Sequence, residues 1–318
     1  MQITINQTNV DVCESECLLE IARRIGCNIP SMCYARGAVH RSSCMVCVVK
    51  DCVTGQIIPS CTTFPEEGMQ IETESEELYN IRNLSLELLL SDHRADCEAP
   101  CSMVCPQQFD IEYFLKLYDS GNTEESVRLI SSTFTLSNLE CVHCKAPCEK
   151  VCRRGTVDKA VSIRKIISEL ASTCQPVETG KVEKDDVQEQ FQSRIGRFTT
   201  IEKEWLKDNI VTRSGCLHCA CAGREGCKLR LYATNAGIKR PRYETSSNLP
   251  VMKKTHVIGK MWFEPAKCIR CGLCVYNSKN GFTFQDRGFV MQVVIPDENR
   301  INVNEKLAEL CPTGALYC

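Results

Sequence analysis

The sequence predicts an α+β protein built from several small domains. Short alternating segments, beginning with Gln2-Ile3-Thr4-Ile5, indicate strands within residues 1–72, and a helical pattern follows them. The chain has 318 residues, enough for two or three domains of ordinary size. It also contains 25 cysteines, a density typical of disulfide scaffolds or metal-binding proteins. The predicted elements are therefore small units organised around cysteine.

The cysteines are expected to act as ligands rather than to form disulfides. The first residues, MQITINQTNVDV, lack the basic and apolar regions of a secretory signal, so we expect a cytoplasmic protein with reduced thiols. Dense cysteine in that compartment favours metal binding. No apolar run approaches about 18 residues, so no membrane span is predicted. A net charge of −2 excludes a chain that is basic overall, as many nucleic-acid binders are, but not a local basic patch.

The N-terminal elements follow from hydrophobic periodicity. Leu18 to Ile25 has helical spacing, and Met45 to Lys50 is predicted to pair with Gln56 to Pro59. Thr73-Glu74-Ser75-Glu76 matches a capping box and predicts a helix that ends near His93.

The later elements are mostly helices. Residues 109–131 predict two helices, FDIEYFLKLY and EESVRLI, broken at Ser120-Gly121, and a further helix is predicted for 157–170. Residues 175–190 are polar and charged and predict a linker. A possible helix and a compact cysteine group follow within 201–232, and residues 256–318 predict a small cysteine-ligated module.

The first cysteine group has the spacing C-x10-C-x2-C-x13-C and consists of Cys33, Cys44, Cys47 and Cys61. Iron–sulfur clusters need four soft thiolates that converge from a loop, whereas a zinc site expects two short pairs and fits badly. With IPSMCY, SCMVCVV and CTTFPEEGMQIETES, the segment resembles the N-terminal 2Fe–2S domain of the complex I 75-kDa subunit and of iron-only hydrogenases. The resemblance implies a β-grasp ferredoxin domain with one 2Fe–2S cluster.

The second group combines a histidine with seven cysteines, enough ligands for two 4Fe–4S clusters. HRADCEAPCSMVCP and ECVHCKAPCEKVCRR, with FDIEYFLKLYDSG between them, resemble the iron–sulfur domain of the glutamate synthase small subunit and dihydropyrimidine dehydrogenase. The resemblance implies interleaved ligand sets. The first set would be His93, Cys97, Cys101 and Cys152, and the second Cys105, Cys144 and Cys148 with Cys141 as the fourth ligand.

Two positions depart from that family. His93 stands where the family has a cysteine pair, and its spacing to Cys97 instead resembles the histidine-ligated cluster of the complex I subunit. The alternative is that His93 is the last residue of the preceding helix and interacts with the helix dipole. Cys141 is not required by the family pattern, and His143 is expected to be a surface residue.

The third group, in SGCLHCACAGREGCKLR, consists of Cys216, Cys219, Cys221 and Cys227. Four thiolates this close are expected to share one metal centre, an iron–sulfur cluster in preference to a single zinc, with His218 as a reserve ligand. The surrounding sequence is basic, which leaves open a nucleic-acid module or a docking patch for an acidic partner such as a ferredoxin. The basic positions are Arg224, Lys228, Arg230, Lys239, Arg240, Arg242, Lys253, Lys254 and Lys260.

The fourth group begins with C-x2-C-x2-C and ends with a distant Cys-Pro; its members are Cys268, Cys271, Cys274 and Cys311. In two-cluster ferredoxins a fourth cysteine of the run ligates the other cluster. Ser278 occupies that position here, so one 4Fe–4S cluster is predicted to be kept and the other lost. With GFTFQDRGF and CPTGAL, this module resembles the ferredoxin-like segment of the complex I and hydrogenase families.

The sequence shows no G-x-G-x-x-G after a strand and no P-loop, so a chain of one-electron carriers is predicted without a substrate pocket. We therefore expect an electron-transfer subunit of a larger oxidoreductase. Its partners would be a flavoprotein that uses NAD(P)H, a molybdenum, tungsten or hydrogenase-type catalytic subunit, or a ferredoxin. A nucleic-acid-associated cluster protein is the alternative. The expected cofactors are one 2Fe–2S cluster and three 4Fe–4S clusters, with a fourth or one zinc at the third group.

The expected domains are a β-grasp domain at 1–75, a helical two-cluster domain at 76–174, a linker at 175–200, the third cysteine group at 201–255 and an α+β module at 256–318. Cysteines outside all four groups are expected to be small buried hydrophobic residues. They are Cys13, Cys17, Cys27, Cys52, Cys174 and Cys318.

Overall fold

The structure is a computed structural model, and it describes residues 1–93, 96–135, 139–156, 158–173, 212–221, 227–238, 242–243 and 254–318. The chain forms two compact units. The first contains Met1–Arg94, Glu225–Ser247 and Lys254–Cys318, and the second contains Ala95–Arg224 and Asn248–Lys253. The predicted linker at 175–200 and the predicted helix that follows it lie outside the described residues. None of the described helices combines the length and the apolar character that crossing a membrane requires.

The first unit begins with a five-stranded mixed sheet in the order β2-β1-β5-β3-β4. The strands are β1 (Gln2–Ile5), β2 (Thr8–Asp11), β3 (Val48–Asp51), β4 (Ile57–Pro59) and β5 (Gln70–Glu72). β1 and β5 are parallel, and the other pairs are antiparallel. The predicted pairing of β3 with β4 is confirmed, with Val49 opposite Ile58. Successive side chains of β1 point to opposite faces of the sheet, so Ile3 and Ile5 share one face. Both are buried in one core with the apolar residues of helix α1 (Leu18–Arg24).

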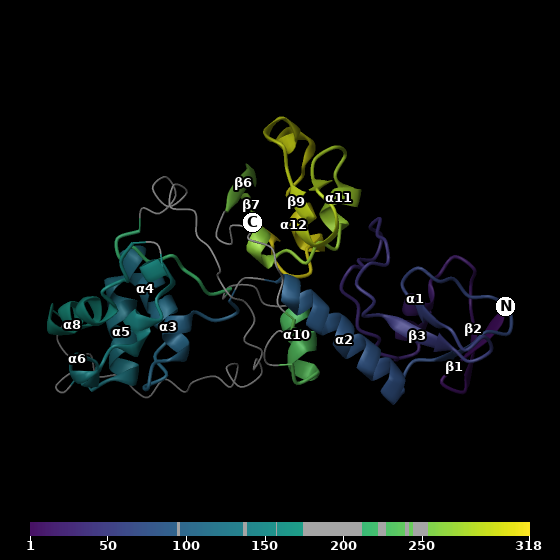
Figure 1. The fold of residues 1–318 in the computed structure, drawn as a ribbon, viewed down its shortest axis with the longest axis horizontal. Coiled ribbons are helices and arrows are strands. Elements are labelled where there is room, and N and C mark those ends of the chain that lie inside the picture. The colour runs from purple at the N-terminus through teal and green to yellow at the C-terminus, as the bar shows by residue number, and fades with distance from the viewer. Residues whose placement is uncertain are drawn as a thin grey trace. The chain divides into compact units, whose positions relative to one another are not determined.

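Helix α2 (Glu76–Asp92) follows the sheet and ends at His93, as predicted. Its predicted capping box does not form, because Ser75 makes no side-chain cap and the Thr73 hydroxyl accepts a hydrogen bond from Asn6 instead (2.6 Å). The buried Arg82 guanidinium donates to the carbonyl oxygens of Val48 (2.6 Å) and Thr73 (2.9 Å) and so fixes α2 to the sheet. Helix α10 (Lys228–Asn235) lies alongside α2 (Figure 1).

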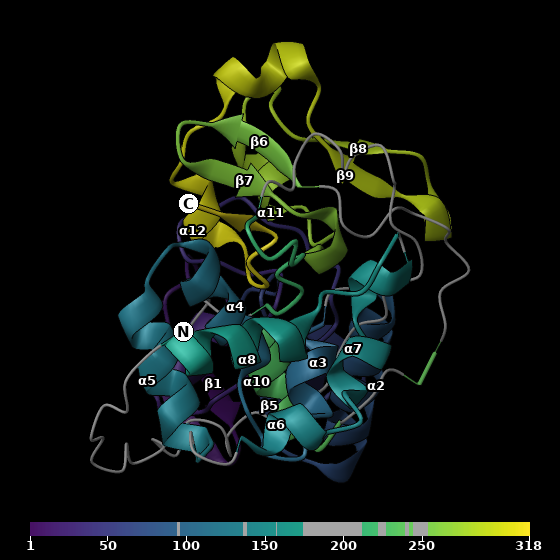
Figure 2. The ribbon, with the colours of Figure 1, turned by 90° about the vertical axis from the view of Figure 1, so that its left-hand side faces the viewer.

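The C-terminal part of the first unit is a small α+β module. A three-stranded sheet has the order β10-β7-β6, and β8 and β9 form a separate antiparallel ribbon (Figure 2). The strands are β6 (Thr255–Ile258), β7 (Met261–Phe263), β8 (Thr283–Gln285), β9 (Gln292–Val294) and β10 (Leu316–Tyr317). The helices are α11 (Leu273–Asn277) and α12 (Leu307–Leu310), with 3₁₀ turns at Pro265–Lys267, Gly288–Val290 and Asp297–Asn302. The rings of Phe263 and Phe282 meet edge to face in the core of this module.

The described part of the second unit is helical. Its helices are α3 (Pro100–Met103), α4 (Ile111–Asp119), α5 (Thr123–Thr133), α6 (Glu140–His143), α7 (Pro147–Lys150) and α8 (Ile163–Thr173), with a 3₁₀ turn at Arg153–Thr156. The predicted break between α4 and α5 is confirmed. A new helix begins after the break because the Asn122 side chain caps α5 by accepting a hydrogen bond from the Glu125 N–H (3.3 Å). The Asp110 side chain caps α4 in the same way, by accepting from the Tyr113 N–H (3.2 Å). The predicted helix at 157–170 begins only at Ile163, and residue 157 lies outside the described residues.

Candidate metal centres

The first predicted ligand set is gathered at one place in the first unit. Cys33, Cys44, Cys47 and Cys61 are all buried, between the loop that follows α1 and the end of β4. Hydrogen bonds join the thiol of Cys33 to those of Cys44 and Cys61, and the thiol of Cys47 to that of Cys61. Hydrogen bonds from the thiols of Cys44 and Cys61 hold the pKa of Cys33 far below its usual range, and Cys61 likewise lowers the pKa of Cys47 to about 7. The same hydrogen bonds, together with burial, raise the pKa of Cys44 and Cys61, so protons are held unevenly among the four thiols. Binding of iron requires all four as thiolates.

The fourth predicted set lies around a cavity in the C-terminal module. Cys268, Cys271, Cys274 and Cys311 line a cavity of about 330 Å³, counting the part open to solvent, together with apolar side chains such as Phe263 and Leu273. The turn between the first two cysteines has a distinct form. Arg270 has a positive φ of 57°, and its N–H donates to the Cys268 sulfur (3.3 Å). Burial raises the pKa of Cys268 to about 12, and the hydrogen bond from the Arg270 N–H offsets part of that rise.

The two sites of the first unit are neighbours. Asn277 on α11 donates to the Val39 carbonyl (2.7 Å) and accepts from the Val39 N–H (2.9 Å), which ties α11 to the loop between Cys33 and Cys44. Burial and then the nearby Cys311 raise the pKa of Cys271, and Cys33 adds to that rise. The charges of the two ligand sets therefore interact directly.

Lys228 occupies the space beside both sets. Its main-chain N–H donates to Pro312, next to Cys311, and its ammonium donates to the Tyr34 carbonyl, next to Cys33 (3.4 Å). Burial and the cation of Arg23 lower the pKa of Lys228, whereas the nearby thiolates raise it. The first unit thus places a half-buried lysine beside two cysteine sites.

In the second unit, one cavity is lined by the four cysteines that the sequence predicted together. They are Cys105, Cys141, Cys144 and Cys148. Phe109, Phe134 and Ile167 supply apolar walls to this cavity. Burial is the largest cause that raises the pKa of Cys141, to about 11, and that of Cys148, to about 12. His143 is exposed, as predicted.

A second cavity of this unit contains a set that the sequence did not predict. Cys101 and Cys152 line it together with Cys216 and Cys219, two members of the third predicted group. The cavity measures about 340 Å³, counting the part open to solvent, which is close to the C-terminal one. Burial and then Cys216 and Cys152 raise the pKa of Cys101. These four sulfur atoms therefore share one environment.

The segment 212–221 reaches this cavity because it is bound to α4. The Ser214 N–H and hydroxyl both donate to the Asp119 carboxylate (2.6 and 2.7 Å). The Ser214 hydroxyl oxygen in turn accepts from the Cys216 N–H (3.0 Å), and the Arg213 guanidinium lies over the Tyr118 ring at 4.4 Å. The last residues of α4 thus hold the approach to Cys216.

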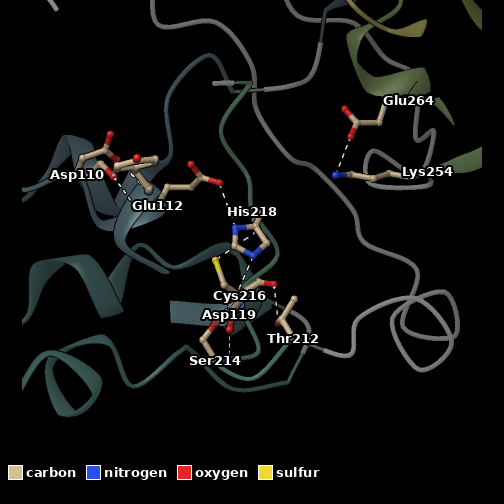
Figure 3. Close-up of polar contacts among 11 residues, drawn as sticks. Asp110, Glu112, Asp119, Thr212, Ser214, Cys216, His218, Lys254 and Glu264 are labelled. Carbon is tan, nitrogen blue, oxygen red and sulfur yellow. Dashed lines mark hydrogen bonds and ion pairs between the residues drawn. The ribbon is translucent and has the colours of Figure 1, made fainter. Parts of the chain in front are cut away.

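His218 is the central polar contact of the segment (Figure 3). Its Nδ1 lies 3.1 Å from Glu112 Oε1 and its Nε2 lies 3.1 Å from Asp119 Oδ2. Burial lowers the pKa of His218, but the Cys216 sulfur and the Glu112 carboxylate outweigh burial and raise it to about 10. His218 is therefore a cation held between two carboxylates rather than a free ligand.

Glu112 and Asp119 were not among the predicted site residues. They share one face of α4, because they are separated by roughly two helical turns. Both side chains are largely buried, which is unusual for carboxylates without a partner. The sequence signal that could have identified them is the presence of two acidic residues on one face of a predicted amphipathic helix.

The remaining predicted ligands lie elsewhere. His93 is buried at the C-terminal end of α2 in the first unit, and Asp92 beside it pairs with Arg270 (3.4 Å). Cys97 is buried in the second unit, next to Asp96, whose carbonyl accepts from the Cys221 N–H (3.0 Å). Neither His93 nor Cys97 lines the cavity that contains Cys101 and Cys152. The structure thus places Cys101 and Cys152, which the resemblance grouped with His93 and Cys97, beside Cys216 and Cys219, which spacing grouped with Cys221 and Cys227.

Every cysteine in the described part of the chain is a free thiol. Of those expected to be small buried hydrophobic residues, Cys17 is buried and Cys27 is half-buried, but Cys13, Cys52 and Cys318 are exposed. Cys174 lies outside the described residues. Within the described ranges, no three His, Cys, Asp or Glu side chains form a group that could hold a single metal ion. The cysteines of two predicted sets, and the set of Cys101, Cys152, Cys216 and Cys219 that was not predicted, instead line cavities.

Two segments match known domain families. Residues 1–76 match the family described as 2Fe-2S iron-sulfur cluster binding domain. Residues 90–178 match the family described as dihydropyrimidine dehydrogenase domain II, 4Fe-4S cluster. Both resemblances predicted for these regions are confirmed, and the mixed helices and sheets fit α+β iron–sulfur domains.

Curated relatives match parts of the chain. The NADP-reducing hydrogenase subunit HndD of Solidesulfovibrio fructosivorans is 30% identical over 48% of this chain and 27% of its own length. The mitochondrial 78 kDa subunit of the NADH-ubiquinone oxidoreductase of Candida albicans is 26% identical over 45% of this chain and 21% of its own length. The gamma subunit of the NAD-reducing hydrogenase HoxS of Cupriavidus necator is 30% identical over 30% of this chain and 41% of its own length. The chain thus corresponds to only a minor part of these relatives.

One solved structure resembles the chain over most of its length. It is the NAD+-reducing [NiFe]-hydrogenase in the H2-reduced state, with a TM-score of 0.52, 16% sequence identity, and coverage of 99% of this chain and 86% of that one. At this identity the likeness concerns the fold alone.

Proposed function

We propose that this chain is an iron–sulfur electron-transfer subunit of a larger oxidoreductase complex. The carrying observation is the arrangement of cysteines in two pairs of neighbouring sites, one pair in each unit. In the first unit, two hydrogen bonds between Asn277 and Val39 join helix α11, which contains Cys274, to the loop between Cys33 and Cys44. In the second unit, Cys101 and Cys148 of adjacent sets lie in the same buried cluster. Neighbouring sites are the arrangement that a relay needs.

The described residues fit clusters by their chemistry. Iron–sulfur clusters take cysteine thiolates and, when bound, exchange one electron at a time. We assign Cys33, Cys44, Cys47 and Cys61 to a 2Fe–2S cluster. We assign Cys105, Cys141, Cys144 and Cys148 to one 4Fe–4S cluster and Cys268, Cys271, Cys274 and Cys311 to another. Apolar side chains such as Phe109, Phe134 and Phe263 line these sites.

We further propose the β-grasp ferredoxin fold for residues 1–75. The mixed sheet order β2-β1-β5-β3-β4, with α1 packed on one face, supports this assignment. The free thiols support a reducing compartment, for which we propose the cytoplasm.

The expected partners follow from the relatives. Their names are those of subunits of NADP-reducing and NAD-reducing hydrogenases and of an NADH-ubiquinone oxidoreductase. We propose that this chain binds a flavoprotein that uses NAD(P)H, and a catalytic subunit of the hydrogenase or molybdenum/tungsten type, or a ferredoxin. Within the complex it would carry electrons between these partners.

The nucleic-acid alternative is disfavoured by the contacts of the basic residues. Lys228 is turned toward Tyr34, Arg242 pairs with Glu87 (3.0 Å), and Lys254 pairs with Glu264 (2.9 Å; Figure 3). Arg224, Lys239, Arg240 and Lys253 lie outside the described residues. A salt-dependent affinity for DNA at physiological ionic strength would favour this alternative.

The test is a redox titration of the anaerobically reconstituted chain, followed by electron paramagnetic resonance. A relay predicts one 2Fe–2S signal and several 4Fe–4S signals that reduce reversibly, and co-purification from the native source of a flavoprotein or catalytic chain. A reconstituted, folded chain without reversible signals would contradict the proposal.

A further inference from the structure

The cavity lined by Cys101, Cys152, Cys216 and Cys219 joins two segments that are distant in the sequence. The first two cysteines belong to the segment that matches a 4Fe–4S domain family, which ends at residue 178. The other two lie beyond that match. The four side chains nevertheless line the same cavity, and Cys101 and Cys216 are both buried.

The second segment is fixed at the cavity by contacts on both sides of Cys216. Ser214, which precedes Cys216 in the chain, binds Asp119. His218, which follows Cys216, binds both Glu112 and Asp119. Moving the segment away would deprive the largely buried carboxylates of Glu112 and Asp119 of these partners, which is costly. The position of Cys216 and Cys219 is therefore determined by the fold of the second unit.

A direct contact also links the two segments. Arg154, two residues after Cys152, donates a hydrogen bond to the carbonyl of Gly215, the residue before Cys216. Gly215 has a positive φ of 72°, and a Cβ there would overlap the Nη1 atom of Arg154. A larger residue would therefore be strained by this φ and would require the Arg154 side chain to shift.

The local turn at Cys216 has the same form as the turn at the C-terminal site. His218 has a positive φ of 47° and its N–H donates to the Cys216 sulfur at 3.3 Å. Arg270 has a φ of 57° and makes the same contact with Cys268, also at 3.3 Å. The two C-x2-C turns are thus built alike, and each presents its cysteines to a four-cysteine cavity of similar size.

We infer that Cys101, Cys152, Cys216 and Cys219 bind one 4Fe–4S cluster. This inference rests on the proposed function and names a site that reaches beyond the segments matched by the two families. It divides the third predicted group, because Cys216 and Cys219 serve this site whereas Cys221 and Cys227 do not. It also replaces His93 and Cys97 as partners of Cys101 and Cys152.

The inference is tested by combining substitutions in the full chain after anaerobic reconstitution. Cys101→Ala and Cys219→Ala are each expected to lose about four irons per chain. The double variant Cys101→Ala/Cys219→Ala is expected to lose about four as well, because both residues serve one cluster. The matched control, Cys219→Ala/Cys274→Ala, is expected to lose about eight, because its residues serve two clusters.

Electron paramagnetic resonance provides a second readout that needs only the single variants. The signal that disappears in Cys101→Ala should be the one that disappears in Cys219→Ala, while the 2Fe–2S signal persists and reports that the chain is folded. A loss of about eight irons in the Cys101/Cys219 double variant, or two different missing signals, would overturn the inference and leave the proposed function intact. The absence of reversible clusters from the unaltered chain would instead overturn the proposed function.

Discussion

Arg154 and Gly215 are joined by a hydrogen bond from the guanidinium to the glycine carbonyl, and this contact connects the segment of Cys152 to the segment of Cys216. Arg154 also pairs with Asp158 (3.0 Å), which holds the guanidinium in place. The pairing with Asp158 lowers the pKa of that carboxyl to about 2. The contact between Arg154 and Gly215 is therefore a fixed feature of the second unit.

Gly215→Ala is expected to displace the segment and to destabilise the reconstituted protein by roughly 2–4 kcal/mol, combining left-handed strain with a clash against Arg154. Thermal unfolding and iron content measure the two effects. Gly237→Ala is the matched control, because Gly237 has a similar φ of 67° but nothing within 4 Å of an added Cβ. It should cost only about 1 kcal/mol and no iron. Equal effects of the two changes would contradict the close approach.

His218→Ala should lower stability by roughly 2–3 kcal/mol, because it leaves the carboxylates of Glu112 and Asp119 without their cation. The signal assigned to the Cys101 site should broaden or fall in intensity, since the turn that presents Cys216 loses its anchor. Chemical denaturation and electron paramagnetic resonance check these expectations. The exposed His143→Ala is the control and should change stability by less than about 0.5 kcal/mol. An unaltered His218→Ala protein would show that the segment is held by other contacts.

Lys228→Met removes the half-buried cation beside two sites, and we expect the midpoint potentials of both to fall. The reduced state carries the more negative charge, so a nearby cation stabilises it. Potentiometric titration of the 2Fe–2S signal and the C-terminal 4Fe–4S signal measures the shift. Lys306→Met, which alters an exposed lysine of the same unit, should leave both midpoints unchanged. Unshifted midpoints in Lys228→Met would separate this lysine from the electrostatics of the sites.

Cys311→Ser is expected to remove the C-terminal 4Fe–4S signal and to keep the 2Fe–2S signal. Because Cys271 and Cys33 interact, the retained signal should reduce at a higher potential once the neighbouring negative charge is lost. A titration of the variant against the unaltered chain decides the matter. Loss of both signals would mean that the two sites fold as one cooperative element.

The sequence predicted much of the fold and of three ligand sets. The break between α4 and α5 was predictable because Ser120-Gly121 interrupts two periodic segments. The pairing of β3 with β4 was predictable from the short turn between them. Three ligand sets that spacing predicted are each gathered by the structure at one site, because their cysteines are brought together by local turns and adjacent strands. The assignment of these residues as ligands remains a proposal.

The set of Cys101, Cys152, Cys216 and Cys219 could not be obtained from spacing. Spacing favours cysteines that are close in sequence, so Cys216 and Cys219 were grouped with Cys221 and Cys227. Their actual neighbours are set by tertiary contacts, above all those of Ser214 and His218 with Asp119. The predicted capping box does not form for a related reason. The Thr73 hydroxyl accepts a hydrogen bond from Asn6, which lies far away in the sequence in the turn between β1 and β2.

The most direct test of the multi-cluster relay is the iron content of the anaerobically reconstituted full chain, combined with spin quantification of its reduced signals. One 2Fe–2S and three 4Fe–4S clusters predict about 14 irons per chain, with each signal reducing reversibly. Fewer than about ten irons in a folded and fully loaded sample would contradict the multi-cluster relay, because at least two of the four cysteine sites would then not hold a cluster.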